Sequence, residues 1–186
     1  MESLLRVAVE VFNERGYDGT SMEDLAARLG ITKSSIYHHV AGKSELLRLA
    51  VDRALDALFA VLAEPAATAG PAIDRLEHVV RRSVEVLAAE LPFVTLLLRV
   101  RGNTAVERDA LTRRREFDRI VSDLVARAEA AGDIRPDVDP ALTSRLLFGL
   151  VNSLTEWFRP DGELAVADLA DAVVTTAFDG LRRRPE

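Results

Sequence analysis

The sequence predicts an all-α protein of about nine helices. Apolar residues recur at helical spacing along most of its 186 residues, and no strand-like alternation of apolar and polar residues persists. Glycine and proline stand near the ends of the predicted helices, where they begin or stop helical structure. The expected organisation is an N-terminal three-helix domain with a helix-turn-helix over residues 1–46, followed by a larger helical domain over residues 47–186.

The first two predicted helices are marked by apolar stripes and by their ends. Gly16 stops the first helix, because glycine readily adopts the positive φ found at helix ends. Thr20 is expected to cap the second helix, with Glu23 reaching back to complete a capping box. Gly30 then supplies the tight turn of a helix-turn-helix. The apolar stripes comprise Leu4, Leu5, Ala8, Val11, Phe12, Met22, Leu25, Ala26 and Leu29.

The helix after this turn, expected over Lys33–His39, is polar on most of its surface. Thr32 is expected to cap it, Ile31 to fill the small core beside it, and Ile36 to point inward. A short helix with small polar residues at its start and an aromatic residue near its end suits a DNA major groove better than a protein core. The side chains left for solvent or DNA are Lys33, Ser34, Ser35, Tyr37 and His38.

The rest of the chain predicts five more helices and an apolar segment. The stretch from Pro65 to Pro71 is expected to be a loop, and Pro140 is expected to open a helix because proline suits the first helical position. The last two helices are apolar on much of their circumference, which predicts burial on more than one side. They form either a monomer core or a four-helix interface between two copies. The helices are expected over residues 43–63, 73–90, 106–131, 139–158 and 165–181, and the apolar segment over 93–100.

Net charge argues against a nucleic-acid binder, whereas the position of the charges does not. The chain carries 24 Lys and Arg against 30 Asp and Glu, a net charge of −6, although nucleic-acid binders usually show a basic surface. Residues 1–50 hold six Lys and Arg against seven Asp and Glu. Between Gly30 and Ser44, however, there is no acidic residue, and both lysines of the chain, Lys33 and Lys43, fall in this interval.

Composition argues against several other classes of protein. The absence of cysteine excludes disulfides and thiol chemistry. With no run of about 18 uncharged apolar residues and no secretory signal, a cytoplasmic protein that does not enter a membrane is expected. The three histidines lack metal-ligand spacing, and no phosphate loop or hydrolase elbow occurs, so neither a metal nor a cofactor is expected. A helical adaptor protein and a small helical enzyme are the alternatives, and neither needs an acid-free polar helix within residues 30–44.

Residues 4–50 resemble the N-terminal DNA-binding domain of the TetR family of bacterial transcription regulators. The matching residues are Phe12, Gly16-Tyr17, Thr20-Ser21-Met22, Asp24-Leu25-Ala26, Gly30-Ile31-Thr32, Ile36-Tyr37-His38-His39, Lys43 and Glu45-Leu46-Leu47. One departure is Val40, where the family usually carries an aromatic residue that packs the recognition helix. The resemblance implies DNA contacts from Thr20, Thr32, Lys33, Ser34, Ser35, Tyr37, His38 and Lys43.

The resemblance also implies a role for the larger domain. It implies a homodimeric repressor that leaves a palindromic operator when the larger domain binds a small hydrophobic effector, so that DNA and effector weaken each other's binding. It favours a dimer interface over a monomer core for the last two helices. The expected interface residues are Leu147, Leu150, Leu154, Val173, Ala177 and Phe178.

The segment from Gly149 to Pro160 resembles TetR-type regulators that respond to acyl-CoA thioesters. Such a ligand needs an apolar channel for the acyl group and arginines for its phosphates, because guanidinium groups pair bidentately with phosphate oxygens. The alternative effector is an uncharged hydrophobic molecule, for which the arginines have no role. The candidate effector-binding residues are Leu96, Leu97, Arg99, Arg101, Arg114, Phe117, Val121 and Trp157.

Overall fold

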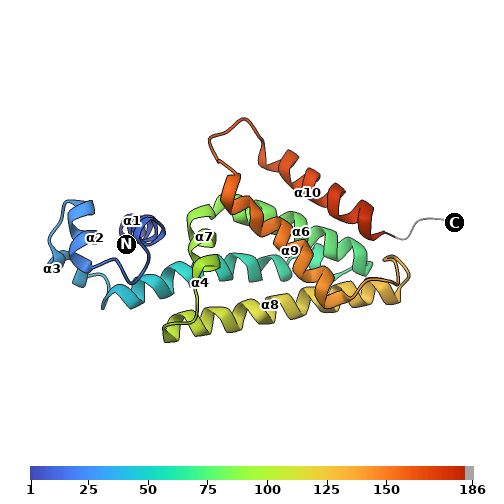
Figure 1. Cartoon of the computed structure of the whole chain (residues 1–186), viewed down its shortest axis with the longest axis horizontal. Coiled ribbons are helices and arrows are strands. Elements are labelled where there is room, and N and C mark those ends of the chain that lie inside the picture. Colours follow the sequence, from blue (N-terminus) through green and yellow to red (C-terminus); the bar gives the residue numbers. More distant parts are fainter. Residues whose placement is uncertain (183–186) are drawn as a thin grey trace. The chain divides into compact units, whose positions relative to one another are not determined.

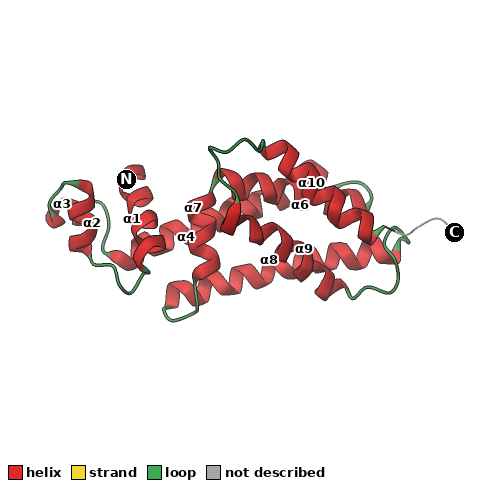
Figure 2. Ribbon diagram, turned by 45° about the horizontal axis from the view of Figure 1, so that its top comes forward, coloured by secondary structure: helices red, strands yellow, loops and turns green. Residues whose placement is uncertain are grey.

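The computed structural model describes residues 1–182, which form helices joined by loops (Figure 1, Figure 2). No strand occurs among these residues; one isolated bridge pairs Ile134 with Arg182. None of the helices in the described residues is long and apolar enough to cross a membrane. The all-α prediction is confirmed. The ten described helices are α1 (Glu2–Arg15), α2 (Met22–Leu29), α3 (Lys33–Tyr37), α4 (Lys43–Leu62), α5 (Pro65–Thr68), α6 (Ala72–Ala89), α7 (Leu91–Arg99), α8 (Ala105–Ala130), α9 (Pro140–Trp157) and α10 (Val166–Leu181).

These helices group into two compact units. The first unit holds residues 1–56 and 90–112, and the second holds residues 57–89 and those from 113 onward. The division falls inside α4 and inside α8. The first unit therefore includes α7 together with the N-terminal helices. The boundary expected at residue 46 stays a prediction.

The turn between α1 and α2 shows how the chain enters the helix-turn-helix. Gly16 ends α1 with φ 79°, as predicted. The capping box of α2 lies one residue later than predicted: the Asp24 N–H donates to Ser21 Oγ at 3.1 Å, and the Ser21 N–H donates to Asp24 Oδ2 at 2.8 Å. Thr20 instead donates its hydroxyl to the Gly16 carbonyl at 2.8 Å.

The helix-turn-helix itself follows the sequence closely. Gly30 adopts the left-handed conformation with φ 67°, and Thr32 caps α3 by accepting from the Ser35 N–H at 3.2 Å. Ile36 is fully buried, as predicted. The prediction for Ile31 is wrong, because its side chain is 43% exposed. The helix also ends at Tyr37, two residues before its expected end.

In the first unit, α7 packs against α1. The Asn13 side chain donates from Nδ2 to the Pro92 carbonyl at 2.8 Å, and Arg99 Nη1 donates to the Asn13 carbonyl at 2.7 Å. Arg53 joins the same region by pairing with Glu2 and with Glu90, each at 2.7 Å. The apolar segment expected over 93–100 is thus part of a helix that braces α1.

The second unit is organised around α6, which contacts α5, α9 and α10; α10 lies alongside α6 in Figure 1. Its core includes Phe117, whose ring lies 5.8 Å from that of Phe59 and 5.2 Å from that of Phe148. The loop expected from Pro65 to Pro71 contains the short helix α5 instead, because Pro65 occupies the first helical turn, where a missing N–H costs nothing.

Candidate functional site

The outer face of α3 is a continuous polar surface. Ile36 anchors the helix in the core of the first unit, while the Tyr37 side chain, 48% exposed, lies on the solvent side. Ser35 is partly exposed, and its hydroxyl lies 2.9 Å from Thr32 Oγ1. The predicted DNA contacts that are exposed on this surface are Thr32, Lys33, Ser34, Tyr37 and His38.

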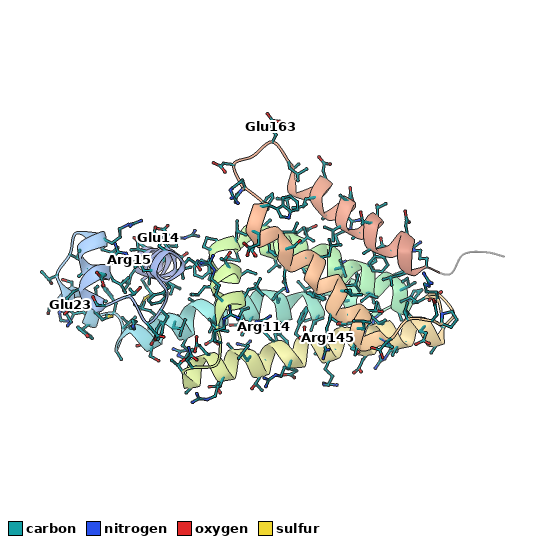
Figure 3. The ribbon with its side chains drawn as sticks, in the orientation of Figure 1. Glu14, Arg15, Glu23, Arg114, Arg145 and Glu163 are labelled. Carbon is teal, nitrogen blue, oxygen red and sulfur yellow. The ribbon has the colours of Figure 1, made fainter. Side chains whose placement is uncertain are left out.

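Lys33 has a protein partner in this structure. Its ammonium pairs with the Glu23 carboxylate on α2 and lies 5.9 Å from the centre of the Tyr37 ring. This hydrogen bond raises the pKa of Lys33 and lowers the pKa of Glu23. Both groups are exposed, so the pair is weak and can exchange for a phosphate. Glu23 is labelled in Figure 3.

Two of the side chains predicted to contact DNA, those of Lys43 and Thr20, form hydrogen bonds within the protein instead. The Lys43 ammonium donates to the carbonyls of Tyr17 and Thr20 at 2.7 and 2.8 Å, and it lies 4.3 Å from the centre of the Tyr17 ring. Thr20 is 2% exposed, and its hydroxyl bonds to Gly16. Lys43 therefore fastens the start of α4 to the turn that precedes α2, a role that the sequence analysis missed. This geometry disfavours the DNA contact expected of Thr20.

The residues expected at a dimer interface lie mostly inside the second unit. Leu147, Leu154, Val173 and Phe178 are buried there without any second copy. Ala177 is partly exposed, and Leu150 is the member of the set classed as exposed. The exposed apolar side chains of α9 lie on another face of the helix and are Leu142, Leu146, Leu150 and Trp157.

The candidate effector residues fall into two groups, one in each unit. Leu96, Leu97, Arg99 and Arg101 belong to the first unit, and Arg114, Phe117, Val121 and Trp157 belong to the second. Leu96, Arg99 and Arg101 line a pocket of about 350 Å³ with the turn of residues 16–19. Leu97, Phe117 and Val121 are buried core residues, and the Trp157 side chain is 52% exposed.

A group of arginines lies where α8 meets α9 in the second unit. Arg115, Arg119 and Arg145 line a pocket of about 300 Å³ with Asp118 and Ser144. Arg114 of α8 and Arg145 of α9 are labelled in Figure 3.

Partial burial shifts the pKa of two residues where α8 meets α9, Arg114 and Asp118. These residues and Arg115, Arg119 and Arg145 make up the α8–α9 group. Burial lowers the pKa of Arg114, although a guanidinium stays charged at neutral pH. Burial also raises the pKa of Asp118, in spite of the nearby Arg114 and Arg145. The group is therefore predominantly cationic. Among residues 1–182, no cluster of three His, Cys, Asp or Glu side chains is suited to hold a metal ion.

Family models match both parts of the chain. One described as "Bacterial regulatory proteins, tetR family" matches residues 4–50, and one described as "Tetracyclin repressor-like, C-terminal domain" matches residues 69–181. The chain belongs to the TetR family. The helix-turn-helix and the polar face of α3 are thus those of a family of DNA-binding transcription regulators.

Individual TetR-family relatives match nearly the whole chain. The regulator SCO3833 from Streptomyces coelicolor A3 is 60% identical, with a TM-score of 0.91, over 97% of this chain and 91% of that one. The repressor KstR2 from Rhodococcus jostii strain RHA1 is 29% identical over 96% of this chain and 89% of its own. AibR, solved in complex with isovaleryl coenzyme A and operator DNA, is 26% identical, with a TM-score of 0.81, over 95% of this chain and 97% of that one. The protein is a ligand-responsive DNA-binding regulator of this family.

Proposed function

We propose that this TetR-family protein is a homodimeric repressor that binds a palindromic operator through α3 and is released from it by an acyl-CoA thioester. The observation that carries the DNA-binding part is the exposed polar face of α3, held by the buried Ile36 and free of acidic residues between Gly30 and Ser44. Lys33, Ser34, Ser35 and His38 read base edges, while Tyr37 contacts phosphate. KstR2, a relative over nearly the whole chain, is itself a repressor.

In-vitro selection from random duplex DNA with the full-length protein tests this part. The expected product is an inverted repeat whose half-sites lie about one helical turn apart, because two recognition helices must enter successive major grooves. A Ser34→Ala or His38→Ala variant should change the preferred sequence, whereas Tyr37→Phe should weaken all sequences alike. Enrichment of a single, non-repeated site, or of none, would contradict the proposal.

The dimer forms through the exposed apolar face of α9 together with α10. Leu142 and Leu146 are 54% and 65% exposed, and with Leu150 they stand four residues apart on one face of the helix. A contiguous apolar surface of this kind on a soluble protein indicates a protein interface. The exposed side of α10 adds small residues that permit close approach, among them Ala172 and Thr176.

The arginines of the α8–α9 group supply the phosphate contacts of the effector. Arg115 and Arg145 line one pocket and have no carboxylate partner at ion-pair distance among the described residues, so their guanidinium groups are available for phosphate oxygens. The AibR complex, which contains isovaleryl coenzyme A and operator DNA, supports this class of ligand.

Titration of the protein–operator complex tests the effector. Acyl-CoAs of several chain lengths and phenylacetyl-CoA are added, with the free acids and free CoA as controls, and operator binding and Trp157 fluorescence are followed. A CoA thioester should release the DNA, and an Arg115→Gln, Arg145→Gln double variant should require at least tenfold more of it, since each charge-assisted contact is worth about 1.5 kcal/mol or more. Release by an uncharged hydrophobic molecule, and by no thioester, would contradict the acyl-CoA assignment. It would not contradict the proposal that the protein is a repressor.

A further inference from the structure

The pocket at the end of α1 lies wholly within the first unit. Its lining combines the last turn of α1, the turn of residues 16–19 and the end of α7. Its volume of about 350 Å³ is at the lower end of the range for small-molecule pockets. It is therefore large enough for a small organic molecule and too small for a whole acyl-CoA.

One part of this pocket is apolar. Phe12, Leu47 and Leu96 line it, and each of these side chains is almost completely buried. They come from α1, α4 and α7, so three helices of the first unit form the apolar surface. An apolar portion of a ligand would be removed from water here.

The other part carries positive charge. Arg99 and Arg101 line the pocket and are exposed, and no carboxylate forms an ion pair with either within the described part of the chain. Arg99 donates a hydrogen bond to the Asn13 carbonyl, which is uncharged. Arg15 also lines the pocket, but it pairs with Asp24 at 3.3 Å.

The acidic residues of the lining do not neutralise these two arginines. Glu107 is 7% exposed, and its carboxylate accepts from the backbone N–H groups of Thr104 and Arg101 at 2.9 and 3.5 Å, which caps the start of α8. Asp18 also lines the pocket; it is exposed and makes no ion pair among residues 1–182. Two cationic side chains thus stand beside an apolar surface with their charge unpaired.

We propose that this pocket binds a small organic carboxylate with an apolar body, and that it is a ligand site separate from the one that takes the acyl-CoA. The carboxylate pairs with Arg101 and Arg99, and the apolar body lies against Phe12 and Leu96. Charge-assisted hydrogen bonds to guanidinium hold the carboxylate, and the apolar contact selects against inorganic anions. A ligand here rests directly on α1 and on the turn that Lys43 holds.

Nuclear magnetic resonance titration of the full-length, DNA-free protein tests the site. Phenylacetate and hexanoate are the probes; phenylacetamide, which keeps the shape without the charge, and inorganic phosphate, which keeps the charge without the apolar body, are the controls. Both carboxylates should shift the amide signals of Gly16 and Gly19, which line the pocket, and leave those of Gly162 and Gly180 in the second unit unchanged. Phenylacetamide and phosphate should bind at least tenfold more weakly.

Two variants then separate binding in this pocket from binding elsewhere. Arg101→Gln removes an exposed charge and should weaken phenylacetate binding about tenfold. Asn103→Trp fills the pocket from an exposed loop position without changing charge and should abolish binding. The matched control, Arg127→Gln, removes an exposed arginine of the second unit and should have no effect.

Absence of carboxylate binding, equal binding of phenylacetamide, or insensitivity to both pocket variants would overturn the proposal. Because the measurement uses neither operator DNA nor CoA, such a failure leaves the repressor and its acyl-CoA response untouched. Conversely, a protein that failed to bind an operator would still be expected to bind phenylacetate.

Discussion

Arg99, at the end of α7, donates from Nη1 to the main-chain carbonyl of Asn13 on α1 at 2.7 Å. Asn13 in turn donates from Nδ2 to the carbonyl of Pro92, near the start of α7, at 2.8 Å. One residue of α1 is thus joined to both ends of α7. Its Oδ1 is buried without a hydrogen-bond partner among the described residues. An unpaired buried acceptor costs free energy, so this joint holds a stabilising and a destabilising group on the same side chain.

Asn13→Ala should therefore be nearly neutral for stability. The substitution removes the bond to Pro92, worth about 1 kcal/mol, and also removes an unpaired acceptor with a penalty of similar size. We expect the free energy of unfolding, measured by urea denaturation, to change by less than about 1 kcal/mol. Asn13→Asp, which places a carboxylate oxygen against the Pro92 carbonyl, should cost about 2 kcal/mol or more. A large loss in Asn13→Ala would mean that Oδ1 has a partner in solution.

Lys43 and Lys33 are the two lysines of the chain, and replacing each with alanine tests what its contacts contribute to stability. Lys43→Ala removes two hydrogen bonds to carbonyls and a cation–π contact. The free energy of unfolding of the DNA-free protein should therefore fall by about 2 kcal/mol. Lys33→Ala, which breaks an exposed ion pair with Glu23, should change stability by less than about 1 kcal/mol. Unchanged stability in Lys43→Ala, together with weaker DNA binding, would favour the DNA contact predicted for Lys43 from the sequence.

If Lys33 contacts the operator as proposed, Glu23 competes with the DNA for its ammonium group. Glu23→Gln should raise operator affinity a few-fold, because the ammonium is freed and a negative charge near the phosphates is removed. Glu14→Gln is the matched control, since Glu14 is also exposed and pairs with Arg28 instead. Both variants are compared by fluorescence anisotropy at several salt concentrations. Weaker binding in Glu23→Gln would indicate that the carboxylate contacts a base rather than restraining Lys33.

The sequence predicted the positions of the helices far better than it predicted which side chains face inward. The capping box shows why: Thr20 and Ser21 are both capping residues, and each is followed three positions later by an acid, Glu23 or Asp24. The pattern fits both registers, and the burial of the Thr20 hydroxyl decides between them. In α9, Leu146 and Leu147 are adjacent and equally apolar, so periodicity cannot tell the monomer core from an interface.

In the candidate site, too, the sequence predicts some features and misses others. The polar face of α3 follows from composition, since Ile36 is the one large aliphatic residue within Lys33–Tyr37 and must point inward. The role of Lys43 does not follow from composition, because its partners are main-chain carbonyls, which every residue carries. The candidate effector residues share only their chemical character in the sequence, and the fold distributes them over two units.

The pKa of Asp118 predicts a pH-dependent stability. Partial desolvation raises this pKa above its ordinary value of 3.8, so the native state binds the proton more tightly than the unfolded state does. Stability is then highest below that value and falls as pH rises through the interval up to the folded-state pKa. Asp118→Asn should raise the Tm at neutral pH, and the gain should vanish well below pH 3.8. The control Asp123→Asn removes a carboxylate that is likewise exposed but is paired with Arg119, and it should show no such gain.

The position of the dimer interface is tested by two charges on neighbouring helices. Leu146 is 65% exposed in the monomer, so Leu146→Asp should leave the fold intact and, if the α9 face forms the interface, bury an unpaired charge between copies. The expected product is a folded monomer with helical circular dichroism and much weaker operator binding. Val173 is 6% exposed, so Val173→Asp buries its charge within the second unit itself and should unfold the protein rather than merely separate the copies. Sedimentation velocity at micromolar concentration distinguishes the two results. A Leu146→Asp protein that stays dimeric would place the interface elsewhere, and a folded, monomeric Val173→Asp protein would return it to the buried residues first predicted from the sequence.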